Sequence, residues 1–220
     1  MDTAQWGPDG WKLLHCIAYY YDKGKGKGKD KDNIKPFLRS IGHLLPCIYC
    51  RRSYKQYISE LHPTNENVMK WMYKIHNKVN SKLKKQGYND KPDPLFDEIE
   101  EKYKRIFKGN KNCTVMGWDF LYSIIFSYDE GISQTRKKAY VTFFNGLANF
   151  LPNEVSQTKY KEYIQKNPIE KCIEDGGCLK KWFYSFEKSF KKKCCTYTSR
   201  CKKIEKYRVD KCVGNTCRSL

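Results

Sequence analysis

The chain has 220 residues, of which 40% are hydrophobic and 15% aromatic, and its formal net charge is +19. This length suits one large domain or two small ones, and the hydrophobic fraction is high enough to form packed cores. No apolar run reaches the roughly 18 residues that a transmembrane helix needs, so we expect no membrane partner. Few segments alternate with period two and many show helical spacing, which predicts an all-α protein.

The positive charge has two interpretations, a nucleic-acid partner or a lysine-rich solvated surface. The lysines are scattered along the whole chain, and no nucleic-acid-binding motif accompanies them. We therefore favour the solvated surface and do not expect a nucleic-acid partner.

The first predicted element is a helix over about residues 11–21, after a turn at residues 6–10, Trp-Gly-Pro-Asp-Gly. Trp11, His15 and Tyr19 recur at every fourth position and so lie along one stripe of this helix. His15 is either a satisfied core residue or, with its aromatic neighbours, part of a surface for a flat heteroaromatic ligand.

A Gly-Lys-rich loop at residues 23–32 separates this helix from one over about residues 34–45. The next helix runs to about residue 61 and opens with Pro46-Cys47-Ile48-Tyr49-Cys50-Arg51-Arg52. Its first turn holds Cys47 and Cys50, where free N–H groups and the positive end of the helix dipole favour thiolates. Arg51 and Arg52 act in the same direction, so we predict a reactive, reversible Cys47–Cys50 disulfide.

A long helix over residues 66–85 carries His76, Asn77 and Asn80 beside its apolar stripe. These residue types are poor helix formers, so they mark either an exposed polar face or a functional site. Gly87, Pro92 and Pro94 then predict a loop, and a short helix follows over about residues 97–107. Residues 108–112 are the best domain boundary.

The second half of the chain repeats the first. Residues 118–129 align with 11–22, residues 141–164 with 35–58, and residues 181–184 with 70–73, in order and at a nearly constant offset. The aligned copy keeps the aromatic and aliphatic positions but changes the polar ones: Cys47 to Asn153, Cys50 to Ser156, His15 to Tyr122, His76 to Glu187 and Asn80 to Lys191. We therefore predict that the five changed residues of the first half form one site.

Seven of the 11 cysteines crowd the C-terminal fifty residues. Cys172 and Cys178 bracket a short turn-rich loop and predict a local structural disulfide, whereas Cys212 and Cys217 form a candidate exchanging dithiol. Zinc is a rival interpretation, but the tail has no CxxC and no histidine, so we expect no metal. Residues 1–5 lack the basic and apolar regions of a secretory signal, which points to redox chemistry or zinc in a reducing compartment.

Three motifs now combine: Trp11-x-x-x-His15, Pro46-Cys47-x-x-Cys50 and His76-Asn77-x-Val79-Asn80-x-x-Leu83. Over roughly residues 6–107 they resemble the Erv/ALR-type FAD-dependent sulfhydryl oxidases, most closely the members from large DNA viruses. The second half resembles the degenerate Erv-like module of quiescin-type members. The chain departs from the family after Asn80, where it reads Leu83-Lys84-Lys85-Gln86 instead of Leu-Gly-Lys-Pro.

The resemblance implies a helical bundle that holds FAD at its end, usually as a homodimer. It implies that Cys47 exchanges with a substrate or shuttle dithiol and that Cys50 makes the charge-transfer contact with the isoalloxazine. The implied cofactor-binding positions are Gly7, Trp11, His15, Tyr19, Cys50, His76, Asn77, Val79, Asn80, Leu83, Lys85 and Tyr103.

We thus expect an FAD-linked thiol oxidase that takes electrons from protein dithiols to O₂ and releases H₂O₂. The expected parts are a catalytic domain (1–107), a degenerate Erv-like domain (108–193) and a Cys-rich tail (194–220). The tail holds Cys212 and Cys217 as the shuttle candidate, with Cys194, Cys195 and Cys201 as the alternatives. A homodimer in the host cytoplasm or the virion is expected. The rivals are a thioredoxin-like reductase, for which no βαβ pattern exists, and a basic zinc- or nucleic-acid-binding module with a structural CxxC.

Overall fold

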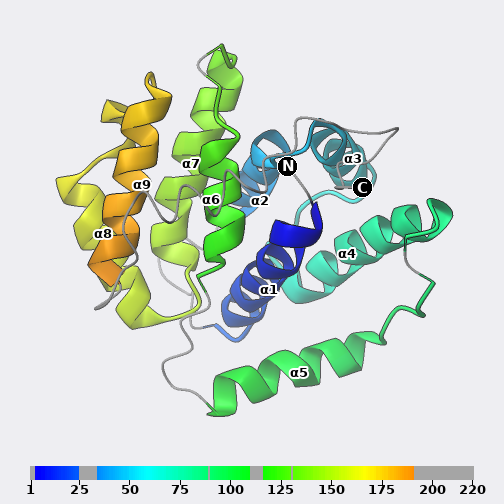
Figure 1. Ribbon diagram of the computed structural model, residues 1–220. Coiled ribbons are helices and arrows are strands. Elements are labelled where there is room, and N and C mark those ends of the chain that lie inside the picture. The colour runs from blue at the N-terminus through cyan, green and yellow to red at the C-terminus, as the bar shows by residue number, and fades with distance from the viewer. Residues whose placement is uncertain (1–2, 25–33, 89, 110–115, 130, 191–220) are drawn as a thin grey trace.

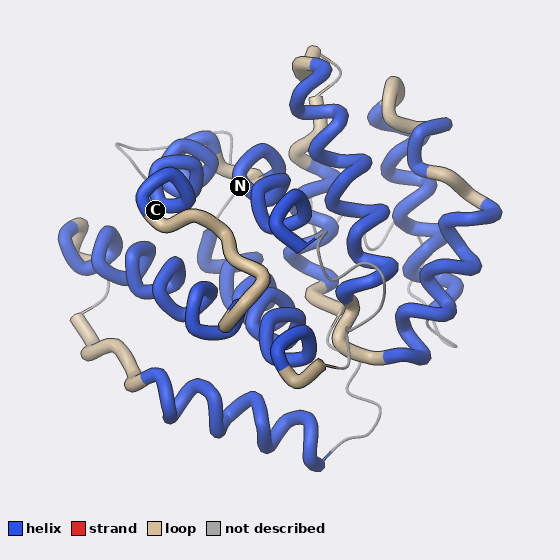
Figure 2. The backbone as a smooth tube through the Cα atoms, turned by 180° about the vertical axis from the view of Figure 1, so that it is seen from behind, coloured by secondary structure: helices blue, strands red, loops and turns tan. Residues whose placement is uncertain are grey.

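The computed structural model describes residues 3–24, 34–88, 90–109, 116–129 and 131–190, and in these ranges all regular structure is helical (Figures 1 and 2). The helices are α1 (Thr3–Asp22), α2 (Ile34–Leu44), α3 (Ile48–Glu60), α4 (Val68–Lys85), α5 (Phe96–Gly109), α6 (Trp118–Phe126), α7 (Gln134–Phe150), α8 (Glu154–Lys166), the short 3₁₀ helix η2 (Ile169–Lys171) and α9 (Gly176–Phe190). The expected all-α class is confirmed. Cys212 and Cys217 lie outside the described residues.

The turn expected at residues 6–10 is wrong, because α1 already begins at Thr3 and contains Pro8. Proline removes one helical hydrogen bond, so packing has to hold this turn in the helix. Trp6 is buried with its ring centroid 5.7 Å from that of Phe120, and a Cβ on Gly10 would lie 2.9 Å from the same phenylalanine. Contacts with a distant helix therefore override the local turn signal.

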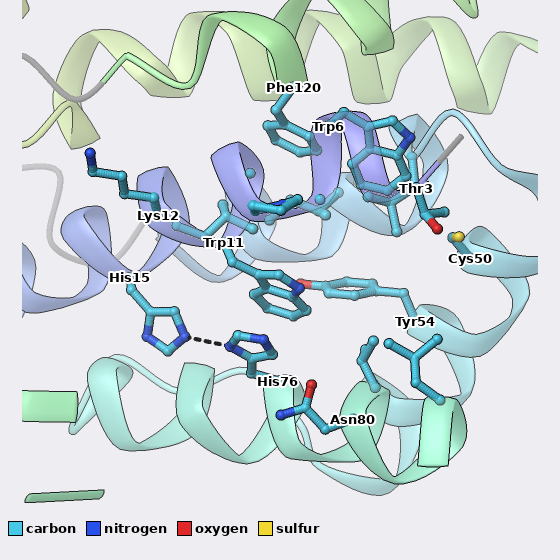
Figure 3. Close-up of a pocket in the computed structure, with 18 of the residues that line it drawn as sticks. Thr3, Trp6, Trp11, Lys12, His15, Cys50, Tyr54, His76, Asn80 and Phe120 are labelled. Carbon is cyan, nitrogen blue, oxygen red and sulfur yellow. Dashed lines mark hydrogen bonds between the residues drawn. The ribbon is translucent and has the colours of Figure 1, made fainter. Parts of the chain in front are cut away.

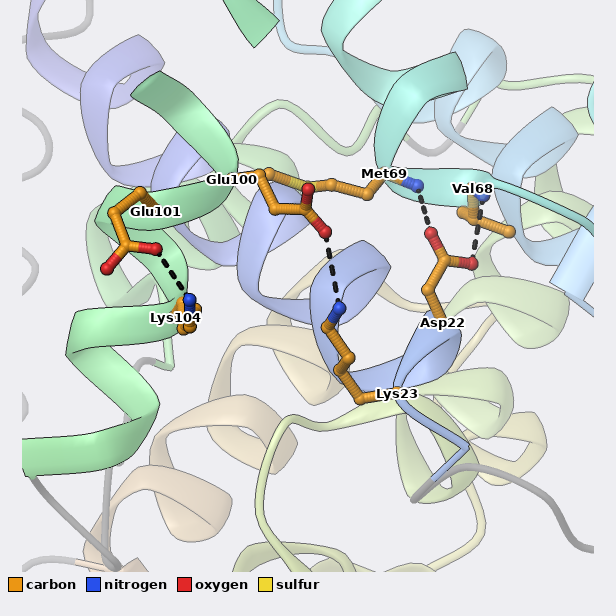
Figure 4. Close-up of polar contacts among 7 residues, drawn as sticks. All are labelled: Asp22, Lys23, Val68, Met69, Glu100, Glu101 and Lys104. Carbon is orange, nitrogen blue, oxygen red and sulfur yellow. Dashed lines mark hydrogen bonds and ion pairs between the residues drawn. The ribbon is translucent and has the colours of Figure 1, made fainter. Parts of the chain in front are cut away.

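Asp22, at the end of α1, fixes the start of α4 (Figure 4). Its carboxylate accepts hydrogen bonds from the backbone N–H groups of Val68 at 3.0 Å and Met69 at 2.8 Å. It supplies the cap that Asn67 does not, because the Asn67 side chain makes no capping hydrogen bond. Lys23 pairs with Glu100 of α5 at 3.2 Å. These contacts place α4 and α5 against α1.

The two halves of the chain, residues 3–109 and 116–190, share one hydrophobic core. In Figure 1, α6 and α7 lie beside α1 and α2, with α8 and α9 outside them. At this contact, the rings of Phe37 in α2 and Phe143 in α7 stack, with centroids 4.9 Å apart and an angle of 9°. These two phenylalanines are aligned with each other in the sequence repeat.

A second set of contacts between the halves is reciprocal. Gly10 leaves room for Phe120, and Gly117, at φ +60°, leaves room for Leu13, whose side chain would lie 2.9 Å from an added Cβ. Gly10 aligns with Gly117, and Leu13 aligns with Phe120. The contact of Gly10 with Phe120 is therefore repeated, with the two halves exchanged, by the contact of Gly117 with Leu13. Such reciprocal contacts are the pattern of a two-fold interface.

Candidate redox and cofactor site

A cavity of about 870 Å³ opens between α1, α3, α4 and α5 (Figure 3). Nine of the predicted site residues line it: Gly7, Trp11, His15, Cys50, His76, Val79, Asn80, Leu83 and Tyr103. The volume is within the range of small-molecule and cofactor sites in proteins, about 300–1,000 Å³. The structure therefore brings together groups that lie far apart in the sequence.

Four other predicted residues do not line this cavity. Cys47 is buried behind Cys50, with 2% of its surface exposed, and Tyr19 packs its ring on Phe107 instead, at 5.2 Å. Asn77 and Lys85 lie on α4 but outside the cavity wall.

His15 and His76 form a hydrogen-bonded pair across α1 and α4, with His15 Nε2 and His76 Nδ1 3.0 Å apart (Figure 3). In this hydrogen bond one of the two ring nitrogens carries the proton and donates it, and the other accepts. Burial, with the charges of His76 and Lys102, lowers the pKa of His15 to about 3. Burial also lowers the pKa of His76 to about 4. Both imidazoles are therefore neutral near pH 7.

Aromatic rings extend this pair into a stacked wall. The Trp11 ring lies parallel to that of His76, with centroids 3.9 Å apart and an angle of 8°. Tyr103 of α5 stacks on His15 at 5.3 Å and 19°. No third ring fits between Trp11 and His76 at this spacing, so a planar ligand has to use the outer faces of the wall.

Three buried polar atoms of cavity-lining residues have no hydrogen-bond partner within the described ranges: Trp6 Nε1, His15 Nδ1 and Gln86 Oε1. Buried polar groups are nearly always satisfied in folded proteins, so unpaired ones in a cavity wall point to a bound polar molecule. The cavity thus offers aromatic faces together with donors and acceptors, which suits a heteroaromatic ligand with polar edges.

Cys47 and Cys50 take up the first turn of α3 as predicted. Cys47 is the N-cap residue, and its sulfur accepts a hydrogen bond from the Cys50 backbone N–H at 3.3 Å. Cys50 is half-buried and lines the cavity, at the end opposite His15 in Figure 3. The dithiol therefore has one sulfur, that of Cys50, at the cavity and a second, that of the more buried Cys47, at the α2–α3 turn.

The reduced pair shares one proton. A hydrogen bond from the Cys50 thiol, helped by the N–H groups of Cys50 and Tyr49, lowers the pKa of Cys47. The same bond and burial raise the pKa of Cys50, while the charges of Lys82 and Arg51 lower it. This bond exists only when both sulfurs are reduced, with the shared proton on Cys50 and Cys47 as the thiolate. Once Cys47 is in a disulfide with another molecule, only burial opposes the two cations at Cys50.

Lys82 is a site residue that the sequence analysis missed. Its Nζ donates to Ser53 Oγ at 2.9 Å, which joins α4 to α3 one turn beyond Cys50. Lys82, Ser53 and Cys50 all line the cavity. Arg52, in contrast, lies over the Tyr49 ring, with 6.0 Å between its guanidinium carbon and the ring centroid. The cations that act on the dithiol are thus Lys82 and Arg51.

Asn80 is held by the loop that follows α4. Its Nδ2 donates to Asp93 at 2.8 Å, and Lys84 pairs with the other oxygen of that carboxylate at 2.9 Å. This fixes the Asn80 amide at the cavity wall.

The aligned positions of the second half are filled by protein. The Tyr122 hydroxyl donates to the buried Glu187 carboxylate, in place of the pair of His15 and His76. The ring of Trp118, aligned with Trp11, packs on Phe186 at 5.3 Å. At these aligned positions, side chains of the second half thus bond to and pack on one another.

The family model described as "Erv1 / Alr family" matches residues 8–104. The mitochondrial FAD-linked sulfhydryl oxidase of Saccharomyces cerevisiae is 35% identical over 91 residues, which cover 40% of this chain and 48% of that protein. A probable FAD-linked sulfhydryl oxidase of Acanthamoeba polyphaga mimivirus is 31% identical over 86 residues, 36% of this chain and 59% of that protein.

The FAD-linked sulfhydryl oxidase of an African swine fever virus isolate is 30% identical over 84 residues, 37% of this chain and 70% of that protein. The chain thus spans only about half of the first two relatives, 48% and 59%. No solved structure matches it significantly. In the described ranges, no helix combines the length and apolar character needed to cross a bilayer. The same ranges contain no group of three or more His, Cys, Asp or Glu side chains suited to a metal ion.

Proposed function

Because this chain belongs to the Erv1 / Alr family, we propose that it is an FAD-dependent sulfhydryl oxidase that forms disulfide bonds in protein dithiols. The observation that carries this proposal is the position of Cys50. Its sulfur belongs to a helix-capping CxxC pair and lines a cavity whose walls combine stacked aromatic rings with unpaired buried polar atoms.

The cavity residues fit FAD. Trp11, His76 and Tyr103 offer ring faces, and Trp6, His15 and Gln86 offer the unpaired donor and acceptor atoms. When bound, FAD would supply a two-electron acceptor for the reduced dithiol and a route for those electrons to O₂, with release of H₂O₂. The neutral histidine pair keeps positive charge out of this wall, and Lys82 supplies a cation at the dithiol end.

Cys47 is the sulfur that we assign to exchange. A substrate thiolate attacks Cys47 Sγ, the Cys47–Cys50 bond breaks, and its electron pair leaves on Cys50 Sγ. The second substrate thiol, as a thiolate, then attacks the mixed disulfide and releases Cys47 as a thiolate. The substrate leaves as a disulfide, and the enzyme holds the two electrons as its reduced Cys47 and Cys50 pair. One of the two protons of the substrate dithiol is shared between these sulfurs, and the other goes to solvent. Since Cys47 is buried, the α2–α3 turn around it has to open for the attack.

A purified full-length protein tests the proposal directly. We expect a yellow protein with a flavin absorbance band that consumes O₂ when dithiothreitol is added. Cys50→Ser should keep the flavin and lose the oxygen consumption. A colourless protein, or a Cys50→Ser variant that still oxidises dithiothreitol, would contradict the proposal.

We also propose that the second half is a degenerate copy that takes the place of a partner subunit. The stacked Phe37 and Phe143 and the reciprocal glycine contacts support this, because they join aligned positions. A homodimer, which the sequence predicts, then has to use another surface, since α6 and α7 cover α1 and α2. Light scattering distinguishes a 26.1 kDa monomer from a dimer.

The remaining assignments follow from the same comparison. We propose that the substrates are protein dithiols, with Cys212 and Cys217 as the shuttle, and that the protein acts in the host cytoplasm or the virion. Cys212→Ser/Cys217→Ser tests the shuttle: it should slow the oxidation of a reduced protein but spare that of dithiothreitol, which reaches Cys47 directly. Equal loss with both substrates would contradict this role.

A further inference from the structure

Four cations surround the start of α3, and none of them pairs with a carboxylate among the described residues. This basic cluster consists of Arg51, Arg52, Lys55 and, from α7, Arg136. Lys55 lies against the end of α2, where its Cγ would be 3.3 Å from a Cβ added to Gly42. The charges of Lys55, Arg136 and Arg51 help burial to lower the pKa of the neighbouring His43. Arg136 donates to the His43 carbonyl at 3.0 Å, not to a carboxylate.

Arg51 has a structural task that does not need its charge. Its Nη1 donates to the Leu45 carbonyl at 2.6 Å and so closes the turn before the dithiol. In the second half, Gln157 is aligned with Arg51, and its Nε2 donates to the aligned Leu151 carbonyl at 2.7 Å. A neutral amide thus makes the same structural hydrogen bond. The positive charge that Arg51 places beside Cys47 and Cys50 is therefore not needed to close the turn.

The neighbouring positions differ in the same way. Arg52 aligns with Thr158, and the exposed Ile48 aligns with the exposed Glu154. The first turn of α3 has no acidic residue, whereas that of α8 has Glu154. The helix that carries the thiols is thus the more basic of two helices with otherwise similar caps.

We propose that the basic cluster docks an acidic protein segment that carries the substrate dithiol. The inference rests on the proposed oxidase function and adds the substrate class. A cluster of unpaired cations raises the local concentration of an anionic partner and orients it during encounter. Because the cluster surrounds the turn that holds Cys47, an acidic segment bound there brings its thiols directly to Cys47, without passing through the basic tail that carries Cys212 and Cys217.

Three synthetic dithiol peptides test the inference on the full-length protein. They share length and cysteine spacing, and their flanks are rich in Asp and Glu, in Ser and Gly, or in Lys. The flanks also change the intrinsic reactivity of the thiols. We correct for this by dividing each rate of O₂ consumption by the rate at which the same peptide reduces 2,2′-dithiodipyridine, a neutral disulfide. We expect the corrected kcat/KM of the acidic peptide to be roughly tenfold higher than that of the basic peptide. This ratio should become smaller at high salt, because salt screens the charges.

Two double variants change the net charge of the protein by the same amount. Comparing them distinguishes an effect of the basic cluster from an effect of the overall charge. Arg52→Glu/Lys55→Glu should bring the ratio of acidic to basic peptide to about one or below, because like charges then face the acidic flank. Lys159→Glu/Lys161→Glu changes exposed lysines of α8, the aligned helix, and should leave the ratio unchanged. Each variant is normalised to its own rate with dithiothreitol.

Equal corrected rates for all three peptides would overturn the inference, and so would an equal effect of the two double variants on the peptide ratio. A third contradicting outcome is that Arg52→Glu/Lys55→Glu loses binding to a duplex oligonucleotide while its peptide ratio stays unchanged. The last would assign the cluster to nucleic acid. Failure of the wild-type protein to oxidise dithiothreitol would instead contradict the proposed oxidase function, so the two failures are distinguishable.

Discussion

Phe37 and Phe143 occupy aligned positions in the two halves of the chain, and their rings stack on each other at 4.9 Å. Both are fully buried, with 1% and 0% of their surface exposed. A contact between aligned residues lies on the two-fold axis that relates the halves. The stability of the cofactor half should therefore depend on a residue of the other half.

Phe143→Ala should lower the free energy of unfolding by roughly 3–5 kcal/mol, because it leaves a cavity at this contact. Since the core is continuous, we expect one unfolding transition in urea, with tryptophan fluorescence and flavin release changing together. Val155→Ala is the control, since Val155 is 57% exposed and should change stability by less than about 0.5 kcal/mol. If Phe143→Ala released its flavin at the same urea concentration as the wild-type protein, the two halves would be independent in stability.

The helices and the dithiol could be predicted because their signals are local. Apolar spacing gives α2, α3 and α4 nearly to the residue, and the CxxC lies on the first turn of α3 as expected. The repeat singled out His15 and His76 by their replacement, and the structure pairs them directly.

What could not be predicted depends on contacts between distant segments. Trp6 and Phe120 meet across the halves, and nothing in the sequence near Trp6 indicates that partner. Lys82 is one of several lysines on α4, and only the packing of α4 on α3 turns it toward the cavity while Lys78 pairs with Glu60 on the surface. Tyr19 shares the stripe of His15, yet α5 places Phe107 on it and takes it out of the cavity wall.

The histidine pair predicts a pH dependence of stability. The pKa of His15 is about 3 and that of His76 about 4 in the folded protein, below the value of about 6.5 expected when unfolded. As pH falls below about 6.5, the unfolded state binds protons that the folded state does not, so stability decreases by up to about 1.4 kcal/mol per pH unit for each histidine. Denaturant unfolding between pH 7 and pH 4 measures this slope.

His76→Gln should make that slope shallower, because one of the two titrating groups is removed while an amide can still bond His15. His62→Gln is the control, since His62 is exposed just after α3 and its ring bonds the Ile58 carbonyl in the last turns of that helix. An unchanged slope in His76→Gln would mean that other groups cause the acid sensitivity.

Lys82 should act on the dithiol through its charge. Lys82→Met removes the cation that lies between α3 and α4, so the alkylation of the reduced thiols by iodoacetamide should shift to higher pH. Lys82→Arg should restore the profile in large part because it keeps the charge. Lys78→Met, one turn earlier on α4, loses an ion pair with Glu60 of α3 at the surface and controls for the lost link between these helices. Equal profiles for Lys82→Met and Lys78→Met would assign Lys82 a purely structural role.

Cys47 has two roles, in exchange and in capping α3, and the second half shows how to separate them. Asn153 is aligned with Cys47 and caps α8 through its Oδ1, which accepts from the Ser156 N–H at 3.0 Å. Cys47→Asn should therefore keep the cap and the wild-type stability but abolish oxidation of dithiothreitol. Cys47→Ala should lose the oxidation and also about 1 kcal/mol of stability, a typical cost of removing an N-cap.

Asn153→Ala completes the comparison in the other half. It should lose a similar stability, about 1 kcal/mol, because it removes the same kind of cap, while dithiothreitol oxidation continues below the unfolding temperature. Thermal unfolding and O₂ consumption of the three variants measure both effects. If Cys47→Asn and Cys47→Ala are equally destabilised, the Cys47 sulfur contributes more to the structure than a cap that asparagine can replace.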